Sequence, residues 1–510
     1  MRDNRSAVAG NDGARQTMQT EFHPQCTPHE ADPSTLTTSW DTGTPRGLKP
    51  ARLDRTIFET SRLLEYFTDR ELRYQTGKPP SEWPQVVVKE LVDNALDACE
   101  DAGTPPEIDV TVETGDTMMT IAVSDNGPGL APETVAKILD FSVRVSDKEA
   151  YVSPSRGAQG NALKTIIAIP FVSSTAEPKE GHVTIESRGI RHDLTVRTDL
   201  VKQAPDILHE QTAVPIGKNR VAVTLEQKLD FTSTFPPFKQ LSFYETLLRW
   251  LRSYALFNPH AAFRLETPKG NELWPARDPA WTKWTPSDPT SGHWYMPDDL
   301  GRLMGAHIAR SEATGERDLT IREFVGQFRG LTSTIKQKRV AQRVPQNRLS
   351  EFISNGNGHR ELNDPAVAGL LAAMKAESQP VKPAHLGVLG KDRIFNCLRL
   401  WHDLEEEPFE YTAFKGFEQH LPYTLEIALA QKKDDGLLER YLGLNFAPSH
   451  GDPFADWKLA YDCDRKYFAS VGLTGILGQF KVELKHPLVF VLHLTLPGAR
   501  FGSRAKDRLQ

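Results

Sequence analysis

Three polar side chains share one face of the segment from Trp83 to Glu100. Glu90, Asn94 and Asp97 stand four and then three residues apart, which aligns them along one stripe of a helix. Carboxylate and carboxamide groups in such a stripe can bind a polar ligand and serve hydrolytic chemistry. The alternative is a solvated helix face, but the intervening apolar residues indicate a helix that is packed on its other sides.

A further carboxylate leaves a strand-like segment at a turn that contains two glycines. Asp125 follows the alternating residues of Met118 to Val123 and enters the turn 126–129. Glycines at such a turn let a ligand touch the backbone. The alternative is an ordinary Asp-Asn-Gly turn without a ligand.

A loop of small residues then runs into an apolar helical stretch. The loop spans Ser155 to Gly160, and the helical stretch includes Lys164. Backbone N–H groups of such a loop, together with a helix N-terminus, favour phosphate. A glycine-rich loop is common by itself, so the order of the three segments is what makes the pattern specific.

In sequence, order and separation these segments resemble the Bergerat nucleotide site of the GHKL ATPases. The resemblance implies that the chain binds ATP with Mg²⁺ and hydrolyses it. It gives Glu90 the role of the general base that activates water and Asn94 that of the Mg²⁺ ligand. Asp125 would accept the adenine amino group, and Gly127 and Gly129 would admit the base.

The same resemblance implies further nucleotide contacts. They come from Asp97, Lys148, Arg156, Gly157, Gln159, Gly160, Asn161 and Lys164. The chain departs from the family pattern at Ala162, where the loop usually has a third glycine, and at Gly217 to Val221, where the Gly-Thr element is not evident. Because phosphoryl transfer depends on positioning and charge neutralisation, we expect phosphate binding to persist and adenine packing to differ.

Longer stretches resemble one GHKL family, the B subunit of topoisomerase VI, which is a type IIB topoisomerase. The likeness is strongest from Gln85 to Ile108, and Phe58 to Phe67 is similar to the family's N-terminal strap. Residues 146–148 and 155–160 are similar to its ATP lid. Looser likenesses lie at Asn258 to Ala261, at Thr267 to Gly270, and at Leu319 to Phe328, where the family has a helix-two-turns-helix domain.

One lysine near the C-terminus is singled out by the same family. Residues 456–461 resemble its Trp-Lys-x-Tyr element, with one residue inserted before the tyrosine. The likeness implies that Lys458 reaches from a transducer domain to the ATP γ-phosphate and takes part in catalysis. The alternative is an ordinary surface lysine.

Hydrophobic periodicity predicts the elements that position these residues. Helices are expected at Ile57 to Phe67 and Trp83 to Glu100, and helical patterns dominate Asp298 to Lys375 with a break at Asn355 to Gly358. Thr267 to Ser291 reads as an irregular connection. Strands are expected at Ile108 to Val112, Met118 to Val123, His182 to Ser187, Asn219 to Leu225 and Pro487 to Leu496.

The fold class that follows is α+β, with a flexible tail at residues 1–48 and three folded domains, as a length of 510 residues allows. Residues 49–290 would form a Bergerat-fold ATPase α/β sandwich with the N-terminal strap. Residues 291–377 would form a helical, helix-two-turns-helix-like domain, and residues 378–510 a transducer-like α/β domain.

Composition narrows the class of protein. Hydrophobic residues make up 39% and charged residues 25%, as in soluble globular proteins. The apolar runs are too short to span a bilayer and a signal-peptide core is missing, so we expect a cytoplasmic protein without membrane contact. Four cysteines without ligand spacing indicate neither a disulfide framework nor a zinc site.

A net charge of −6 gives no global reason to bind nucleic acid, but one stretch is locally basic. It contains Arg322, Arg329, Lys336, Lys338, Arg339, Arg343 and Arg348 against the single acid Glu323. Such a surface can hold DNA phosphates. A solvated helix face is an equally good interpretation, because aromatic residues are sparse and a base-reading motif is missing.

The sequence thus predicts an ATP-binding and hydrolysing protein that resembles the B subunit of topoisomerase VI. ATP would draw two chains into a homodimeric clamp on double-stranded DNA. Because a tyrosine nucleophile for strand cleavage cannot be assigned, breakage would belong to a separate cleaving partner that resembles the A subunit of topoisomerase VI.

The alternative is a stand-alone GHKL clamp or scaffold, with a role like that of MutL-type or MORC-type proteins and without strand passage. The long helix that carries the family's contact with its DNA-cleaving partner would begin near Gly502 to Lys506, where the sequence ends, and this favours the alternative. A histidine kinase is less well supported, because a phosphoacceptor-histidine helix does not precede the site.

Overall fold

The structure is a computed structural model of the 510-residue chain. It describes residues 63–142, 150–156, 162–226, 232–235, 239–285, 287–356, 359–449, 451–454, 457–462, 465–470 and 472–499. These residues belong to one compact unit, Thr60–Gln510. The tail and most of the strap predicted from the sequence lie outside the described residues, and the predicted domain boundaries remain predictions.

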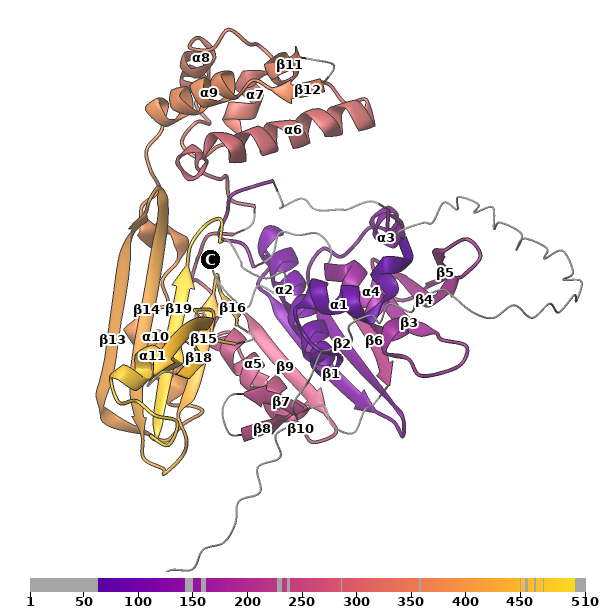
Figure 1. The fold of residues 1–510 in the computed structure, drawn as a ribbon, viewed down its shortest axis with the longest axis vertical. Coiled ribbons are helices and arrows are strands. Elements are labelled where there is room, and N and C mark those ends of the chain that lie inside the picture. The colour runs from indigo at the N-terminus through magenta and orange to yellow at the C-terminus, as the bar shows by residue number, and fades with distance from the viewer. Residues whose placement is uncertain are drawn as a thin grey trace, which may run out of the picture. The chain divides into compact units, whose positions relative to one another are not determined.

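An eight-stranded mixed sheet carries the N-terminal part (Figure 1). Its order is β10-β9-β1-β2-β6-β3-β4-β5; β1 and β9 are parallel, and the other neighbours are antiparallel. The strands are β1 Glu107–Thr114, β2 Met118–Asp125, β3 Gly181–Ser187, β4 Ile190–Asp199, β5 Ala204–Ala213, β6 Asn219–Glu226, β9 Ala262–Thr267 and β10 Gly270–Trp274. A short hairpin, β7 Thr232–Phe235 with β8 Lys239–Ser242, precedes α5.

Helices cover one face of this sheet, because the inward residues of the strands are apolar. Ile108, Val110 and Val112 of β1 are buried, whereas the alternate residue Thr111 is only half-buried. The helices of this part are η1 Leu63–Phe67, α1 Asp69–Thr76, η2 Pro80–Glu82, α2 Trp83–Asp101, α3 Pro132–Leu139, α4 Ala162–Ser173 and α5 Phe243–Phe257. Among them α2, α4 and α5 share the main apolar core with the sheet.

A second apolar core lies in a mainly helical part of the chain. It gathers residues between Trp284 and Leu386, including Tyr295, Phe324 and Phe352. Its elements are η3 Gly292–Trp294, α6 Pro297–Thr314, α7 Ile321–Gly326, α8 Thr334–Ala341, η4 Leu349–Phe352, β11 Ile353–Gly356, β12 His359–Leu362, α9 Asp364–Glu377 and η5 Pro383–Leu386. The break expected between helices is thus the β11–β12 hairpin.

The C-terminal part contains a five-stranded sheet of order β13-β14-β19-β15-β16. Its elements are α10 Lys391–Leu398, β13 Leu404–Glu418, β14 Leu421–Lys432, β15 Glu439–Leu444, β16 Ala447–Pro448, β17 Trp457–Asp462, β18 Arg465–Ser470, α11 Leu473–Gln479 and β19 Leu488–Thr495. The end of α5 packs into this part, because Leu256 and Phe257 belong to the same apolar cluster as Tyr441 and Val491.

Most predicted elements are found, with two corrections. The α+β class, the helix at α2 and the five predicted strands are confirmed. The segment Thr267 to Ser291 is not wholly irregular, because β10 lies within it and pairs with β9. Of the helix expected at Ile57 to Phe67, the described residues form only the 3-10 helix η1.

The structure also bears on membranes. Among the helices of the described residues, none is both long enough and apolar enough to cross a bilayer.

Candidate functional site

Helix α2 presents the predicted polar stripe at three different depths. Asn94 is exposed, Glu90 is half-buried and Asp97 is buried. The helix starts with Pro84 in its first turn, where a missing N–H costs nothing, and 15 of its 19 residues are buried. The rotation of such a helix is set by packing, so Glu90 and Asn94 are held at its open side.

A neighbouring side of α2 is fixed by a buried ion pair. Lys89 Nζ lies 2.6 Å from Asp93 Oδ2, and the Tyr254 hydroxyl of α5 donates to Asp93 Oδ1 over 2.8 Å. Burial lowers the pKa of Lys89, but the carboxylates of Asp93 and Glu90 together outweigh burial and the pKa is raised. Burial and Asp93 together raise the pKa of Tyr254 well above its ordinary value. The three groups anchor α2 to α5.

The end of β2 carries a preformed acceptor. Asn219 of β6 stands opposite Asp125 in the strand register, and its Nδ2 donates to Asp125 Oδ1 over 2.9 Å. The N–H of Gly127 donates to the same oxygen over 2.8 Å. Burial raises the pKa of Asp125, although these two hydrogen bonds lower it. Since both bonds end on Oδ1, Oδ2 is left to accept a hydrogen bond from a ligand.

Two positions of this turn must be glycine, because neighbouring atoms leave no room for a side chain. Gly129 has φ +71, and a Cβ there would lie 2.2 Å from Asn219 Oδ1 and 2.3 Å from Ser187 Oγ. A Cβ at Gly127 would lie 2.9 Å from Asp125 Oδ1. The backbone therefore passes directly over the polar groups that hold the acceptor.

Asn126 ties the turn to the elements behind it. Its side-chain oxygen accepts from the N–H of Glu107 over 2.9 Å, and its Nδ2 donates to Pro105 O over 3.0 Å. The Cys99 thiol, whose pKa is raised to about 12 by burial, lies 3.3 Å from the same oxygen. The turn after β2 is thereby fixed to the end of α2 and the start of β1.

Arg156 occupies a buried ion cluster at the C-terminal end of α2. Its Nη1 lies 2.7 Å from Asp97 Oδ1, and both guanidinium Nη atoms bond Glu100 at 2.8 Å. Lys283 Nζ reaches the same carboxylate at 2.7 Å and His260 Nε2 at 3.1 Å. The side chains of Arg156 and Glu100 are 1% and 3% exposed. Arg156 and Asp97 are thus joined to each other here, and nucleotide contacts from them remain a prediction.

The charged groups of this cluster shift one another's pKa values. Burial alone raises the pKa of Glu100, but Arg156 and Lys283 hold it well below its ordinary value. Burial, and then the neighbouring charge of Arg156, lowers the pKa of Lys283 to about 8. Glu100 is therefore the ionised centre around which the cations gather.

The remaining predicted residues lie at or beyond the limits of the described chain. Lys164 at the start of α4 is buried and donates to the carbonyl of Asp140, with its ammonium 5.6 Å from the centre of the Phe141 ring. Lys458 lies on β17, but its side chain is outside the described residues. Lys148, Gly157, Gln159, Gly160 and Asn161 are outside them altogether.

The donors that are described fit a weakly held magnesium ion better than a protein-made metal cage. Within the described ranges, groups of three or more His, Cys, Asp or Glu suited to a metal are not found. Mg²⁺ usually keeps several waters and takes one or two protein oxygens together with substrate phosphates. The exposed carboxamide of Asn94, one helical turn from Glu90, can supply such an oxygen.

Two residues of the site were missed in the sequence. Asn219 holds Asp125, and Ser187 donates to Asn219 Oδ1 over 3.0 Å and accepts from the N–H of Leu130 over 2.8 Å. Asn219 lies within the segment Gly217 to Val221 that the sequence marked as a departure from the family. An amide there, opposite Asp125 if β2 and β6 pair, was the available signal.

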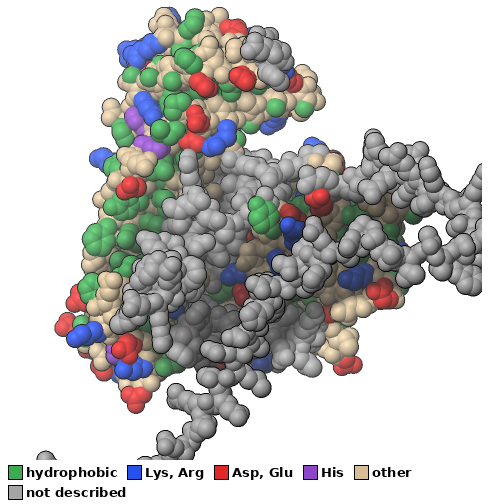
Figure 2. Space-filling view, viewed as in Figure 1, with side chains coloured by type: hydrophobic (Ala, Val, Ile, Leu, Met, Phe, Trp, Pro, Cys, Tyr) green, Lys and Arg blue, Asp and Glu red, His purple; other side chains and the backbone are tan. Residues whose placement is uncertain are grey.

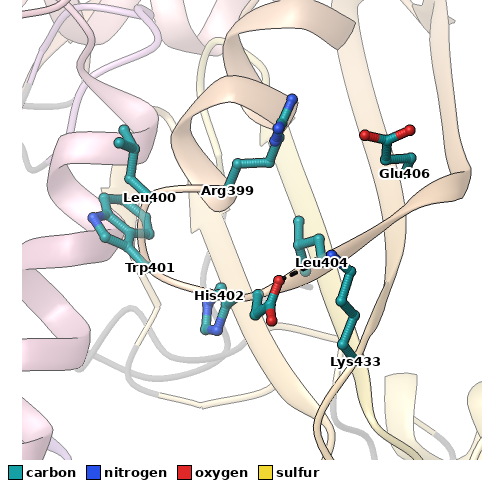
Figure 3. Close-up of a pocket in the computed structure, with 8 residues that line it drawn as sticks. Arg399, Leu400, Trp401, His402, Leu404, Glu406 and Lys433 are labelled. Carbon is teal, nitrogen blue, oxygen red and sulfur yellow. Dashed lines mark ion pairs between the residues drawn. The ribbon is translucent and has the colours of Figure 1, made fainter.

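A cavity of about 370 Å³ lies in the C-terminal part, away from these residues (Figure 3). It is lined by residues 399–404 with Glu406 and Lys433. Its basic and acidic groups partly neutralise each other, since Lys433 Nζ lies 3.2 Å from Asp403 Oδ1. The cavity therefore has no surplus of positive charge that would favour a polyphosphate.

Comparison with known proteins finds a similar family for the segment that carries most of the site. Residues 81–199 match the family described as histidine kinase-, DNA gyrase B-, and HSP90-like ATPase. The B subunit of type 2 DNA topoisomerase 6 from Methanosarcina acetivorans is 33% identical over 192 residues, which cover 36% of this chain and 28% of the relative. That of Thermococcus kodakarensis is 25% identical over 347 residues, covering 64% of this chain and 55% of the relative.

A third relative has the same name, and its match covers a share of this chain between those of the first two. The B subunit of type 2 DNA topoisomerase 6 from Archaeoglobus fulgidus is 29% identical over 246 residues, covering 47% of this chain and 37% of the relative. The chain thus spans between about a quarter and just over half of the length of these relatives. Residues 81–199 thus match the model of the GHKL ATPase domain, and the chain that carries them is similar to the B subunit of topoisomerase 6.

Proposed function

We propose that this chain binds ATP with Mg²⁺, hydrolyses it, and uses it to close a homodimeric clamp on double-stranded DNA. The observation that carries the proposal is the acceptor at the end of β2. Asp125, held through Oδ1 by Asn219 and the N–H of Gly127, offers Oδ2 to an amino group, as adenine requires. Gly129, which has no side chain, lets the backbone of the turn pass close to Asn219 and Ser187 beside it.

The chemistry is assigned to the open side of α2. Glu90 takes the proton of the attacking water, and Asn94 would hold the metal ion, whose charge would neutralise that of the phosphates. Lys458 approaches the γ-phosphate from the C-terminal part. This division agrees with phosphoryl transfer in general, where positioning and electrostatics supply most of the rate enhancement.

Support for an action on DNA comes from the name of the relatives and from the basic stretch. Part of its charge is already neutralised, since Glu377 pairs with Arg343 at 2.6 Å and with Arg339 at 3.5 Å. Arg322 and Lys338 are exposed. On the face shown in Figure 2, basic and acidic side chains are interspersed over α6 to α9, so phosphate contacts on that face would be few and local.

Calorimetry tests the nucleotide site directly. Wild-type protein should release or absorb heat when a non-hydrolysable ATP analogue is added with Mg²⁺, and Asp125→Ala should lose at least about tenfold in affinity. Ser124→Ala, next to Asp125 in β2, is the matched control and should bind as the wild type does. Wild-type protein that is folded and gives no binding heat would refute the proposal.

A second assay separates the topoisomerase role from that of a stand-alone clamp. The chain, mixed with a cleaving protein that resembles the A subunit of topoisomerase VI, should relax supercoiled DNA only when ATP is present. ATP-dependent dimerisation and DNA retention without relaxation would instead assign it to the clamp or scaffold class.

A further inference from the structure

The segment from Ala150 to Arg156, here called the hub segment, is bonded to the helical part. The N–H of Val152 donates to the Tyr295 hydroxyl over 3.1 Å, and the Tyr151 hydroxyl lies 3.5 Å from His307 Nε2. Tyr295 is fully buried. The hub segment is therefore attached to the second apolar core just before the chain enters the predicted phosphate loop.

The same segment is bonded to the C-terminal sheet. Asn445 Nδ2 donates to Ser155 O over 3.2 Å, and the N–H of Gly498 donates to Ser153 O over 3.1 Å. Asn445 is itself fixed, because its Oδ1 accepts from the N–H of Leu496 over 2.9 Å. It is 2% exposed, so these bonds are shielded from water.

The turn that carries Asn445 has an unusual backbone. Asn445 and Phe446, between β15 and β16, have φ values of +49 and +66, which residues other than glycine rarely adopt. Asparagine tolerates this conformation better than most residues, whereas phenylalanine does not. The turn is thus held in a strained form that aims the Asn445 amide at the hub segment.

A second route joins the same turn to Arg156. Asn258, at the end of α5, is 0% exposed; its Oδ1 accepts from Arg156 Nη2 over 2.6 Å, and its Nδ2 donates to Phe446 O over 2.8 Å. Asn445 therefore binds the carbonyl of Ser155 directly. Asn258 bridges the carbonyl of Phe446, the next residue of the turn, and the guanidinium of Arg156, the next residue of the hub segment.

We propose that Asn445 and Asn258 are positioning residues, through which the C-terminal sheet sets the place where the chain enters the predicted phosphate loop. The proposal rests on the proposed ATP site and adds a determinant of triphosphate affinity that lies outside it. The acceptor for the base should be independent, because Asp125, Asn219 and Ser187 hold one another and take no part in these bonds. The C-terminal sheet would then affect the affinity for the phosphates of the nucleotide but not the affinity for its adenine.

The test compares two ligands on full-length protein. In Asn445→Gly the backbone keeps its left-handed turn, but both side-chain bonds are lost. We expect the affinity for a non-hydrolysable ATP analogue with Mg²⁺ to fall about three- to tenfold, the effect of one or two lost hydrogen bonds, and that for adenosine to stay within about twofold. Titration calorimetry measures both affinities, and thermal unfolding confirms that the variant is folded.

The matched control is Gln419→Gly, which replaces another left-handed residue, φ +55, in the exposed turn between β13 and β14. It should bind both ligands as the wild type does. If Asn445→Gly does not fold, Asn258→Asp keeps the acceptor for Arg156, removes the donor to Phe446 O, and should show the same selective loss.

The outcomes separate the two proposals. Wild-type protein that binds neither ligand refutes the ATP site itself. Wild-type protein that binds both, together with a folded Asn445→Gly or Asn258→Asp that binds the analogue equally well, overturns the positioning role alone. A variant that loses adenosine and the analogue to the same degree also overturns it, because the effect is then not specific to the phosphates.

Discussion

Asn219 Nδ2 donates to Asp125 Oδ1 over 2.9 Å from the strand position directly opposite. The bond orients the carboxylate before any ligand arrives, so a ligand need not order it. It is itself supported, because Asn219 Oδ1 accepts from Ser187 and Asn219 Nδ2 also donates to Gly127 O over 2.9 Å. The geometry of the acceptor thus depends on the pairing of β2 with β6 as well as on the turn at Gly127.

Glu90→Gln tests the general base. The amide cannot take a proton from water, so the rate of phosphate release should fall by about a hundredfold or more. Nucleotide affinity should change little, since the side chain keeps its shape, and the dimer should accumulate in the nucleotide-bound form. Steady-state phosphate release and titration calorimetry measure the two quantities. Hydrolysis at the wild-type rate would rule out Glu90 as the base.

Gly129→Ala tests the tight turn beside the acceptor. The left-handed backbone alone should destabilise the variant by about 1–2 kcal/mol, and the new Cβ would also push Asn219 and Ser187 apart. Urea unfolding should show the loss, and calorimetry should show weakened nucleotide binding. Gly217→Ala is the control, because a Cβ at Gly217 meets nothing within 4 Å. Equal stability of the two variants would contradict the expected strain.

Because the pKa of Lys283 is lowered, we expect the free energy of unfolding to depend on pH in the alkaline range. Its pKa in the folded protein is lowered from 10.5 to about 8, by burial first and by Arg156 second. The unfolded chain therefore binds more protons between about pH 8 and pH 10.5, and the free energy of unfolding should rise across that window, by roughly 3 kcal/mol at most. Urea titrations at several pH values measure it. Lys283→Met should remove this rise, and a rise of the same size in both proteins would exclude Lys283 as its source.

Lys458→Ala tests the contact predicted between the C-terminal part and the γ-phosphate. We expect kcat to fall about tenfold or more, because a charge that stabilises the transferred phosphoryl group is lost, while adenosine affinity is unchanged. Lys466→Ala, on the neighbouring strand β18, is the control. If Lys458→Ala has the same kcat as the wild type, the lysine does not contact the γ-phosphate and is an ordinary surface residue.

The elements that carry strong periodicity could be predicted from the sequence, and so could the order of the three motifs. Helix α2 is buried along most of its length and strand β2 buries Met119 and residues 121–123, so burial and local preference agree. The role of Asn219 follows only once the register between β2 and β6 is known, and these strands are far apart in the chain.

The environment of Arg156 could not be predicted for a similar reason. Its partners Glu100, Asn258 and Lys283 lie far away in sequence, and only the fold brings them together. A glycine-rich loop next to an arginine reads as a phosphate contact when the loop is considered alone. The strand β10 and the β11–β12 hairpin were missed for a different reason. Each pairs with a strand next to it in the chain, but strands of four or five residues carry too little alternation to be recognised in the sequence.

The packing of α5 against the C-terminal sheet has a practical consequence for the design of a shorter chain that keeps residues 81–199. Phe257 stacks on His493, with ring centres 5.1 Å apart, and lies so close to β15 that a Cβ at Gly443 would be 2.6 Å from its ring. A fragment that ends before β13 would leave this aromatic ring and Leu256 open to water, each with about 1.5–3 kcal/mol of burial lost. Such a fragment should aggregate on expression unless these positions are made polar.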